Sequence, residues 1–536
     1  MNPTNASYPY RSRRMVMHAR RGMVATSSYL AAQAGLSILQ KQGNAIDAAI
    51  ATAAALTVLE PTSNGIGGDA FAIVHVNGEL FGLNSSGQSP AGISLQSVRN
   101  QGRQEMPKYG WLPVTVPGAP RAWAELSQRF GKLPFATCLE PAISYAEEGY
   151  PLSPILAKGW ARAFEIYRKA LQGDEFRHWF DAFAPCARAP KEGEIWRSAD
   201  HAKTLRRIAD TCAEDFYMGD LAEKIDRFSR DTGGFLRKSD LETYRAEWVE
   251  PVKVSYRGYD VWELPPNGQG LIALMALNTL NHLTLFERES METYHAQIEA
   301  IKLAFADGKL HITDPDYMRI SASALLDPVF AKERAAEIRE VALDPVPGRP
   351  PAGGTVYLAT ADGDGNMVSY IQSNYMGFGS GLVVPGTGIA LQNRGHTFSL
   401  DERDVNVLAP GKRTYHTIIP GFLGKGDDYI GPFGVMGGYM QPQGHVQVAS
   451  NLIDFHMNPQ SALDAPRWQW MEGKKVIVEP EVSQAIVDGL RSKGHEVEVS
   501  ADRGVFGRGQ AILRDSETGV LTGGTEPRTD SGIACW

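Results

Sequence analysis

The sequence predicts an α+β protein whose layered core is assembled from strands in distant parts of the chain, with helices between them. Strand patterns occur at residues 69–84 and again after residue 355, whereas helical periodicity dominates residues 119–340. The chain has 536 residues, of which 43% are hydrophobic and 21% are charged, as is usual for a globular protein. A chain of this length forms either several domains or one large, elaborated fold.

Two helices are the first predicted elements. Residues 27–40 have helical periodicity, and the pattern ends at Gly43. The next segment, NAIDAAIATAAALTVLEP, is rich in alanine, apolar on almost every side, and stopped by Pro61. A helix with this pattern is buried rather than exposed at the surface.

A hairpin follows these helices. Residues 69–84, DAFAIVHVNGELFGLN, alternate in polarity around a turn at Asn77 and Gly78. Just before it, GIGGDA (65–70) matches the G-x-G-x-x-A pattern of dinucleotide sites, but such sites need a strand before the glycines and a helix after them. The order here is reversed, and GFGSG (377–381) lies between two predicted strands. Neither segment therefore predicts a nucleotide site.

The remaining elements follow from the same patterns. The helical region is interrupted near LPPNGQG (264–270). Further strands are predicted at 355–361, 367–372, 381–384, 388–393 and 431–436, and late helices at about 442–456 and 481–494.

Composition excludes several classes of partner. The net charge is −8 and no basic run is longer than Arg11–Arg14, so neither nucleic acid nor an anionic membrane is expected. The four cysteines have no CxxC spacing, which argues against a zinc site or a disulfide framework. No apolar core of signal-peptide length follows the basic N-terminal residues, and no apolar stretch reaches the length of a membrane span. We expect a cytoplasmic protein without a metal.

The stretch PPAGGTVYLATADGDGN (350–366) contains one threonine that follows two glycines. Gly353 and Gly354 give the backbone before Thr355 a conformational freedom that other residues lack. The residues after Thr355 predict a strand that turns at DGDGN into a second strand. On this local pattern alone, Thr355 is an ordinary first residue of a hairpin strand, where threonine is common.

Four longer segments resemble the γ-glutamyltransferase (glutathione hydrolase) family, in order along nearly the whole chain. They are NAIDAAIATAAALTVLEPTSNGIGGDAFAIV (44–74), VPGAPRAWAELSQRFGKLPFATCLEPAISYAEEGYPLS (116–153), NPQSALDAPRWQW (458–470) and TEPRTDSG (525–532). The segments IQS, QNRG and the His-Thr pair are similar to a cytoplasmic branch that includes oxamate amidohydrolase and proteins named cephalosporin acylases. The resemblance implies an N-terminal-nucleophile hydrolase with a four-layer αββα fold and an additional helical region in its first part.

Members of this family cut themselves ahead of a threonine, which then attacks an amide. Aligning GGTVYLATADGDGN and FGSG with the family pattern places that nucleophile at Thr355. We therefore expect a large subunit, residues 1–354, and a small catalytic subunit, residues 355–536, that stay together as one αββα domain. The chemistry suits the position, because a hydroxyl nucleophile needs an adjacent base. The freed α-amino group titrates near ~7.7–8.0 and can supply one.

The resemblance also implies the groups around the nucleophile. FGVMGGYMQPQGH (433–445) matches the family's glycine pair, so the backbone N–H groups of Gly437 and Gly438 are the expected oxyanion hole. Ser373 stands where the family has a second hydroxyl residue that hydrogen-bonds the nucleophile.

The positions that hold glutamate in the family carry other residues here, which become candidate substrate ligands: Ser86, Tyr375, Thr397, His416 and Thr417. Ser86 replaces an arginine that grips the substrate carboxylate, and serine cannot make that directional contact. Weak γ-glutamyl turnover is therefore expected. Arg394 stands where the family has a neutral residue, and it is either the candidate replacement or a structural arginine on a lid loop.

Three functions remain open at this point. The first is an amidohydrolase that acts through an acyl-enzyme on γ-glutamyl-like or small carboxylate-bearing amides. The second is a true γ-glutamyltransferase or glutathione hydrolase that holds glutamate by other residues. The third is an unprocessed, catalytically inactive binding or scaffold protein. No cofactor is expected, and a homo-oligomer is left open.

Overall fold

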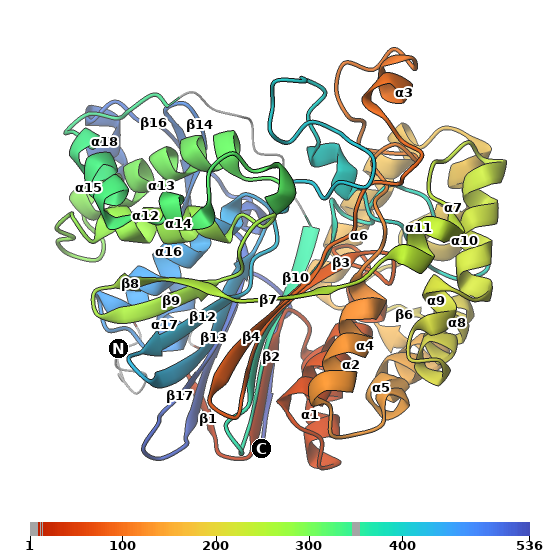
Figure 1. The fold of residues 1–536 in the computed structure, drawn as a ribbon. Helices are drawn as coiled ribbons and strands as arrows, with labels where there is room; N and C mark the ends of the chain where they lie inside the picture. The colour runs from red at the N-terminus through yellow and green to blue at the C-terminus, as the bar shows by residue number, and fades with distance from the viewer. Residues whose placement is uncertain (1–8, 11, 13, 346–353) are drawn as a thin grey trace.

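A computed structural model describes residues 9, 10, 12, 14–345 and 354–536. Two seven-stranded antiparallel sheets pack face to face, and helices cover the outer face of each (Figure 1). This is the four-layer αββα arrangement that the resemblance implies. Gly353 and two arginines of the basic N-terminal run, Arg11 and Arg13, lie outside the described residues.

Both sheets combine strands from the two sides of the expected cut. The first sheet contains, in spatial order, β1 (Met17–Ala19), β18 (Leu521–Thr525), β17 (Arg508–Arg514), β13 (Asp428–Met436), β12 (Gly421–Lys425), β9 (Tyr259–Glu263) and β8 (Val252–Tyr256). The second contains β19 (Gly532–Cys535), β2 (Gly22–Thr26), β10 (Gly354–Asp362), β11 (Met367–Tyr375), β3 (Asp69–Val76), β4 (Glu79–Ser85) and β7 (Glu247–Val249). Separating the chain at residue 354 would therefore leave two incomplete sheets.

Apolar side chains fill the space between the sheets. Phe71 and Ile73 of the second sheet pack in one cluster with Phe422, Met436 and Ile512 of the first, and all five are buried. Burying a side chain of this size contributes about 1.5–3 kcal/mol. The sandwich is thus held by contacts that cross the expected cleavage point.

Helices cover the second sheet on one side and the first sheet on the other. Those on the second sheet are α1 (Tyr29–Gln40), α2 (Ala45–Leu59), α4 (Ala119–Phe130) and α5 (Phe135–Glu148). Those on the side of the first sheet are α12 (Gly270–Leu280), α13 (Met291–His311), α14 (Ala322–Leu325), α15 (Pro328–Glu337), α16 (Met440–Ile453), α17 (Pro459–Asp464) and α18 (Gln484–Ser492).

The buried helix predicted from the alanine-rich segment is confirmed as α2, in which every residue is buried. Its first turn is closed by a capping box, because Asn44 accepts hydrogen bonds from the backbone of Ile46 and Asp47, while Asp47 accepts one from the backbone of Asn44. The predicted hairpin at 69–84 is also confirmed, as β3 and β4.

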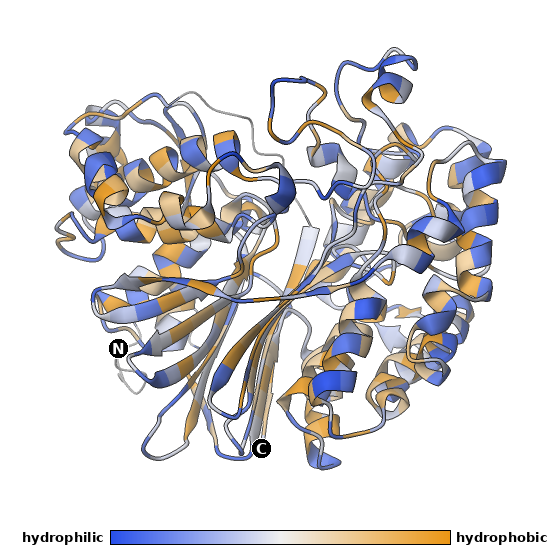
Figure 2. Ribbon diagram, viewed as in Figure 1, coloured by the Kyte–Doolittle hydropathy of each residue, from blue (hydrophilic) through white to orange (hydrophobic). Residues whose placement is uncertain are grey.

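The additional helical region lies outside α5. Its helices are α6 (Pro154–Ala170), α7 (Arg177–Phe183), α8 (Ala199–Asp210), α9 (Glu214–Tyr217), α10 (Asp220–Asp231) and α11 (Lys238–Thr243), and a short α3 (Leu95–Arg99) precedes α4. Figure 2 shows the hydrophilic outer side of this region around α8 and α10. Small sheets complete the fold: β5 (Tyr150–Pro151) with β6 (Ile195–Trp196), and β14 (Trp468–Glu472) with β15 (Lys475–Val478) and β16 (Glu496–Val499). No helix in the described part of the chain is both long and apolar enough to cross a membrane.

Two parts of the predicted secondary structure are wrong. Residues 381–384 and 388–393 are not strands, because only isolated bridges form there and Gly386 and Gly388 turn the backbone with positive φ. The helical middle also contains the β8–β9 hairpin, which was not predicted.

Candidate active site

Thr355 is the second residue of β10 and is only 1% exposed to solvent. The register between β10 and β11 shifts between Gly354 and Val356, so Thr355 lies in an irregularity of the ladder. Such bulges re-aim a side chain and are common beside active sites. The backbone at Thr355 is therefore shaped differently from the rest of the strand.

Ser373 on β11 connects Thr355 to the peptide bond that precedes it. Thr355 Oγ1 donates to Ser373 Oγ at 3.2 Å, and Ser373 Oγ donates to the carbonyl oxygen of Gly354 at 2.7 Å. The backbone N–H of Tyr375 donates to the same Ser373 oxygen at 2.8 Å. One hydroxyl thus contacts both the candidate nucleophile and the carbonyl group that it would attack during self-cleavage.

The glycine pair connects the end of β13 to the start of α16. Gly437 has φ +139° and Gly438 has φ +62°, conformations that favour glycine. A Cβ atom at Gly434, three residues earlier, would lie 2.5 Å from the ring of Tyr357. β13 and β10 are therefore in close contact near the glycine pair, where backbone N–H groups at a helix start can face an anion.

Arg394 lies in a short 3₁₀ helix, η3 (Arg394–Thr397), and is fully buried. Its Nη1 donates to Thr417 Oγ1 at 2.7 Å, and its guanidinium carbon lies 4.4 Å from the centre of the Tyr375 ring. Burial lowers the pKa of Arg394 to about 10, which still leaves it a cation at neutral pH. Its Nε and Nη2 have no hydrogen-bond partner among the described residues.

Those two nitrogens form the side edge of the guanidinium group. Elsewhere in this protein, the same edge of Arg207 holds Asp215 at 2.7 and 2.9 Å, and that of Arg334 holds Asp307 at 2.9 and 2.5 Å. A carboxylate that binds two N–H groups in this way makes a strong and directional contact. The free edge of Arg394 has the geometry to accept one.

Tyr375 and Tyr439 join this arginine to the rest of the site. Tyr375 has φ +76°, unusual for a tyrosine, and its side chain is hydrogen-bonded to Tyr439, the residue after the glycine pair. Burial raises the pKa of Tyr439 to about 12, so its hydroxyl stays protonated. Tyr439 was not expected at the site, although its position beside the glycines was a usable signal.

Asp69 is a second residue that the sequence analysis missed. It begins β3, pairs with Ser373 of β11 in the strand register, and is fully buried. Its carboxylate accepts hydrogen bonds from Gln392 Nε2 at 2.7 Å and from the backbone N–H of Gly87 at 3.2 Å. Burial raises the pKa of Asp69 to about 7, against the opposing effect of the Arg394 charge.

His416 is fully buried, and its side chain contacts Asp69. The backbone N–H of Ile418 donates to His416 Nδ1 at 3.3 Å, so Nε2 carries the ring proton and donates it to Asp69 Oδ2 at 2.9 Å. Burial and the charge of Arg394 hold the pKa of His416 well below its usual value. The ring is therefore neutral, and both of its nitrogens are occupied.

The other candidate ligands lie around this cluster. Ser86 is buried and donates to Asn84 Oδ1 at 2.7 Å, and Thr397 Oγ1 donates to the carbonyl oxygen of Arg394 at 2.8 Å. Thr417 is the residue that accepts from Arg394. The fold thus brings Thr417 and Tyr375 to Arg394 directly, whereas Ser86 and Thr397 support neighbouring backbone and side chains.

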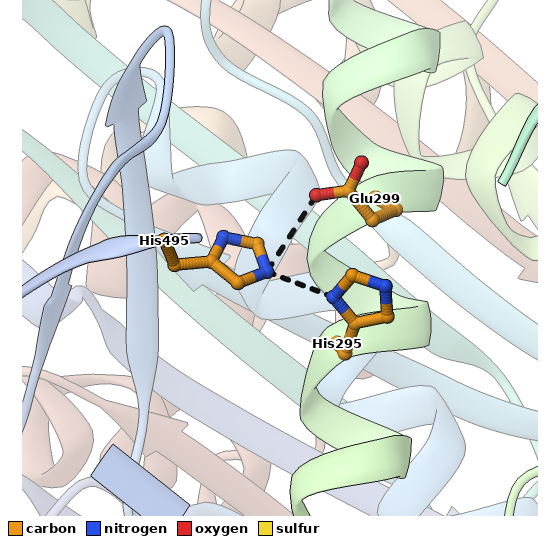
Figure 3. Close-up of side chains that lie close together, drawn as sticks. All are labelled: His295, Glu299 and His495. Atoms are coloured by element: carbon orange, nitrogen blue, oxygen red, sulfur yellow. Dashed lines mark hydrogen bonds and ion pairs between the residues drawn. The ribbon is translucent and has the colours of Figure 1, made fainter. Parts of the chain in front are cut away.

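A separate buried cluster offers donor atoms of the kind that metals bind. His295, Glu299 and His495 each place one such atom within 4.8 Å of the others (Figure 3). His295 Nδ1 lies 2.8 Å from His495 Nε2. However, Lys302 donates to Glu299 Oε1 at 2.7 Å and the backbone of Leu343 donates to Oε2 at 2.9 Å. The carboxylate is already paired with a cation, so we interpret the cluster as an anchor for residues 339–343, which His295 also contacts.

Comparisons with known proteins agree with this geometry. The family model described as gamma-glutamyltranspeptidase matches residues 31–536. A glutathione hydrolase-like YwrD proenzyme of Bacillus subtilis is 37% identical, covering 95% of this chain and 97% of that protein. An oxamate amidohydrolase proenzyme of Klebsiella pneumoniae is 33% identical, covering 96% and 98%. The solved structure of a cephalosporin acylase from Bacillus halodurans is 61% identical, covers 99% of this chain and 98% of that one, and superposes with a TM-score of 0.96.

The match runs through both sides of residue 354 and includes β10, β11, β13 and η3, which carry Thr355, Ser373 and Arg394 and lead into the glycine pair. Both of these relatives are proenzymes, and the fold is that of the solved acylase. The chain therefore belongs to the gamma-glutamyltranspeptidase family of enzymes that act on amide bonds.

Proposed function

We propose that this protein is a self-processing N-terminal-threonine amidohydrolase that cleaves small amides bearing a carboxylate. The observation that carries the proposal is the unpaired side edge of the buried Arg394, in a cluster that reaches the hydroxyl groups of Ser373 and Thr355 through Tyr375. An arginine buried without an anion is costly, and a substrate carboxylate would complete its hydrogen bonds.

Self-cleavage begins with attack of Thr355 Oγ1 on the carbonyl carbon of Gly354. The C–N bond to Thr355 breaks as its nitrogen takes up a proton, which leaves Gly354 joined to the threonine oxygen as an ester. Water then hydrolyses the ester and frees Gly354 as a carboxylate. The hydrogen bond from Ser373 Oγ to the Gly354 carbonyl oxygen supports this step, because it lies where negative charge develops.

Turnover uses the α-amino group that cleavage has released. In its neutral form this amine accepts the proton of Thr355 Oγ1 as the oxygen attacks the substrate carbonyl group. The N–H groups of Gly437 and Gly438 stabilise the oxyanion, and the leaving amine departs with a proton. Water, or a second amine, then resolves the acyl-enzyme on Thr355. No step requires a cofactor.

The acyl group is selected by Arg394, Thr417 and Tyr375. Arg394 binds the carboxylate through Nε and Nη2, while Thr417 holds Nη1 and the Tyr375 ring supports the face of the guanidinium group. His416 acts indirectly, by donating to Asp69. Because Ser86 stands at the family's arginine position and is bonded to Asn84, γ-glutamyl amides are expected to be poor substrates.

A substrate panel tests this function. Purified protein is given γ-glutamyl anilide, oxamate and related small amides with and without a carboxylate, together with the Arg394→Ala variant and an Arg403→Ala control in an exposed loop. We expect hydrolysis of the acidic amides, a loss of about 10–100-fold in kcat/KM in Arg394→Ala, and no change in the control. Efficient γ-glutamyl hydrolysis that is unaffected by Arg394→Ala would favour a true transferase. An intact, inactive chain would favour a binding protein.

A further inference from the structure

Asp69 is the acidic residue whose charge acts most strongly on Arg394, and yet the two form no ion pair among the described residues. The charge of Arg394 is the largest influence that opposes the burial of Asp69, and Asp69 is in turn the largest that favours the charged form of Arg394. The salt bridges of the described residues pair Asp69 with His416 only. The two charges therefore interact through space, and the side edge of Arg394 stays free.

Asp69 is the acceptor in each of the hydrogen bonds that its carboxylate makes. Gln392 Nε2, the backbone N–H of Gly87 and the protonated Nε2 of His416 donate to its two oxygens. These donors favour the carboxylate form, whereas complete burial disfavours it. At neutral pH Asp69 is thus near the midpoint between its charged and neutral forms, and its oxygens have few lone pairs left for a substrate group.

We propose that Asp69 sets the anion affinity of the Arg394 site, by repelling an incoming carboxylate until Asp69 itself takes up a proton. This inference rests on the proposed function, because it assumes that Arg394 binds the substrate anion. It assigns to Asp69 a role in specificity that acts through Arg394. An anionic acyl group binds at the cost of one proton, whereas a neutral acyl group binds without proton uptake.

In the uncut chain, Asp69 is the titratable group of this cluster that can take up a proton near neutral pH. His416 is held neutral by its two hydrogen bonds. The other titratable groups with an electrostatic influence from or on Asp69 are Arg394, Tyr217 and Tyr244, and burial raises the pKa of both tyrosines far above neutrality. The pKa of Asp69, about 7, lies within the range where a bound anion would shift its protonation.

The sign of the effect follows from linkage. A bound carboxylate near Asp69 favours the protonated form of Asp69, so anion binding draws a proton from solution. Affinity for the anion must then rise as pH falls through the pKa of Asp69. Replacing Asp69 by asparagine removes the repulsion at every pH and should tighten anion binding, an outcome that loss of a merely structural residue would not produce.

Acetate is a suitable probe, because it is fully ionised between pH 6 and pH 8. Calorimetric titration is done on the uncut Thr355→Ala chain, with Asp69 either wild type or replaced, because its residue 355 has an amide nitrogen and not a freed amine that would titrate near ~7.7–8.0. Buffers of different ionisation enthalpy give both the affinity and the protons taken up. We expect wild-type binding to tighten about tenfold from pH 8 to pH 6, with net proton uptake near pH 7. Asp69→Asn should bind about tenfold more tightly than wild type at pH 8, without proton uptake. The control Asp427→Asn, in the exposed turn between β12 and β13, should resemble wild type.

The outcomes separate this inference from the proposed function. Acetate binding that is lost in Arg394→Ala but is independent of pH in wild type would overturn the role of Asp69 alone. Weaker binding in Asp69→Asn, with the variant folded, would do the same. Acetate binding that persists unchanged in Arg394→Ala would overturn the carboxylate site itself. If Asp69→Asn does not fold, the wild-type pH dependence and proton uptake still decide the question.

Discussion

Thr355 Oγ1 lies 3.2 Å from Ser373 Oγ and donates a hydrogen bond to it across the β10–β11 pair. Ser373 Oγ in turn donates a hydrogen bond to the carbonyl oxygen of Gly354, so the candidate nucleophile and the bond it would attack share one partner. In the continuous chain the nitrogen of Thr355 is an amide and cannot act as a base. Ser373 is therefore the group best placed to assist self-cleavage before the α-amino group exists.

Replacing Ser373 tests that role. Ser373→Ala removes the donor to the Gly354 carbonyl oxygen, and loss of one such donor typically costs about 10²–10³ in rate. We expect self-cleavage to slow by that order, as followed on denaturing gels over time after synthesis. Ser373→Thr keeps the hydroxyl and should process much faster than the alanine variant. Equal rates for Ser373→Ala and wild type would show that the hydroxyl is not used.

The buried anchor at α13 gives a prediction about stability. Lys302 and Glu299 are both fully buried and form an ion pair of 2.7 Å. Lys302→Met leaves the carboxylate unpaired, which should lower the free energy of unfolding by about 3–5 kcal/mol in urea denaturation. The double variant Glu299→Gln/Lys302→Met should recover most of that loss.

The exposed pair Lys41–Glu140, at 2.9 Å, is the matched control for the anchor. Lys41→Met should change the free energy of unfolding by only about 0–1 kcal/mol, because solvent screens an exposed pair. A loss for Lys302→Met no larger than that of this control would contradict the interpretation of the cluster as an anchor.

Acid sensitivity is predicted from His201 on α8. The side chain is buried against aromatic rings, and burial lowers its pKa to about 4. A histidine with a depressed folded-state pKa contributes stability that is present above the ordinary value near 6.5 and is lost as pH falls toward 4. The free energy of unfolding should therefore fall by about 1.4 kcal/mol per pH unit from this group alone.

His201→Gln removes that titration and should make the decline between pH 6.5 and pH 4 shallower by the same amount. His282→Gln, at an exposed position, serves as its control. Chemical denaturation at four pH values measures all three proteins. A slope for His201→Gln equal to that of wild type would refute the assignment.

The local sequence pattern was enough to predict the elements that depend least on pairing with distant parts of the chain. The helix α2 and the β3–β4 hairpin carry their own periodicity and turn residues, and both are confirmed. The strands β17, β18 and β19 were not predicted, because they are fixed by pairing with partners far away in the chain. Residues 381–393 have a strand-like composition, yet their glycines turn the backbone before a ladder can form.

The candidate site likewise contains residues that the sequence could indicate and residues that it could not. Thr355, Ser373 and the glycine pair were identified by resemblance alone, since their local pattern is that of an ordinary hairpin and turn. Asp69 was overlooked inside GIGGDA, whose glycines were interpreted as a nucleotide motif and as part of the resemblance at 44–74. A carboxylate at the start of an otherwise apolar strand was the usable signal. The stacking of Arg394 on Tyr375 depends on tertiary packing and had no signal in the sequence.

The most direct test of the account is the identity of the fragments of purified protein. Denaturing mass spectrometry with N-terminal sequencing should find two pieces, the smaller of which begins Thr-Val-Tyr-Leu at Thr355, and the two should co-elute under native conditions. Thr355→Ala should give a single chain without amidase activity. A smaller fragment that begins elsewhere, or an uncut Thr355→Ala chain with full amidase activity, would contradict the assignment of Thr355 as the nucleophile.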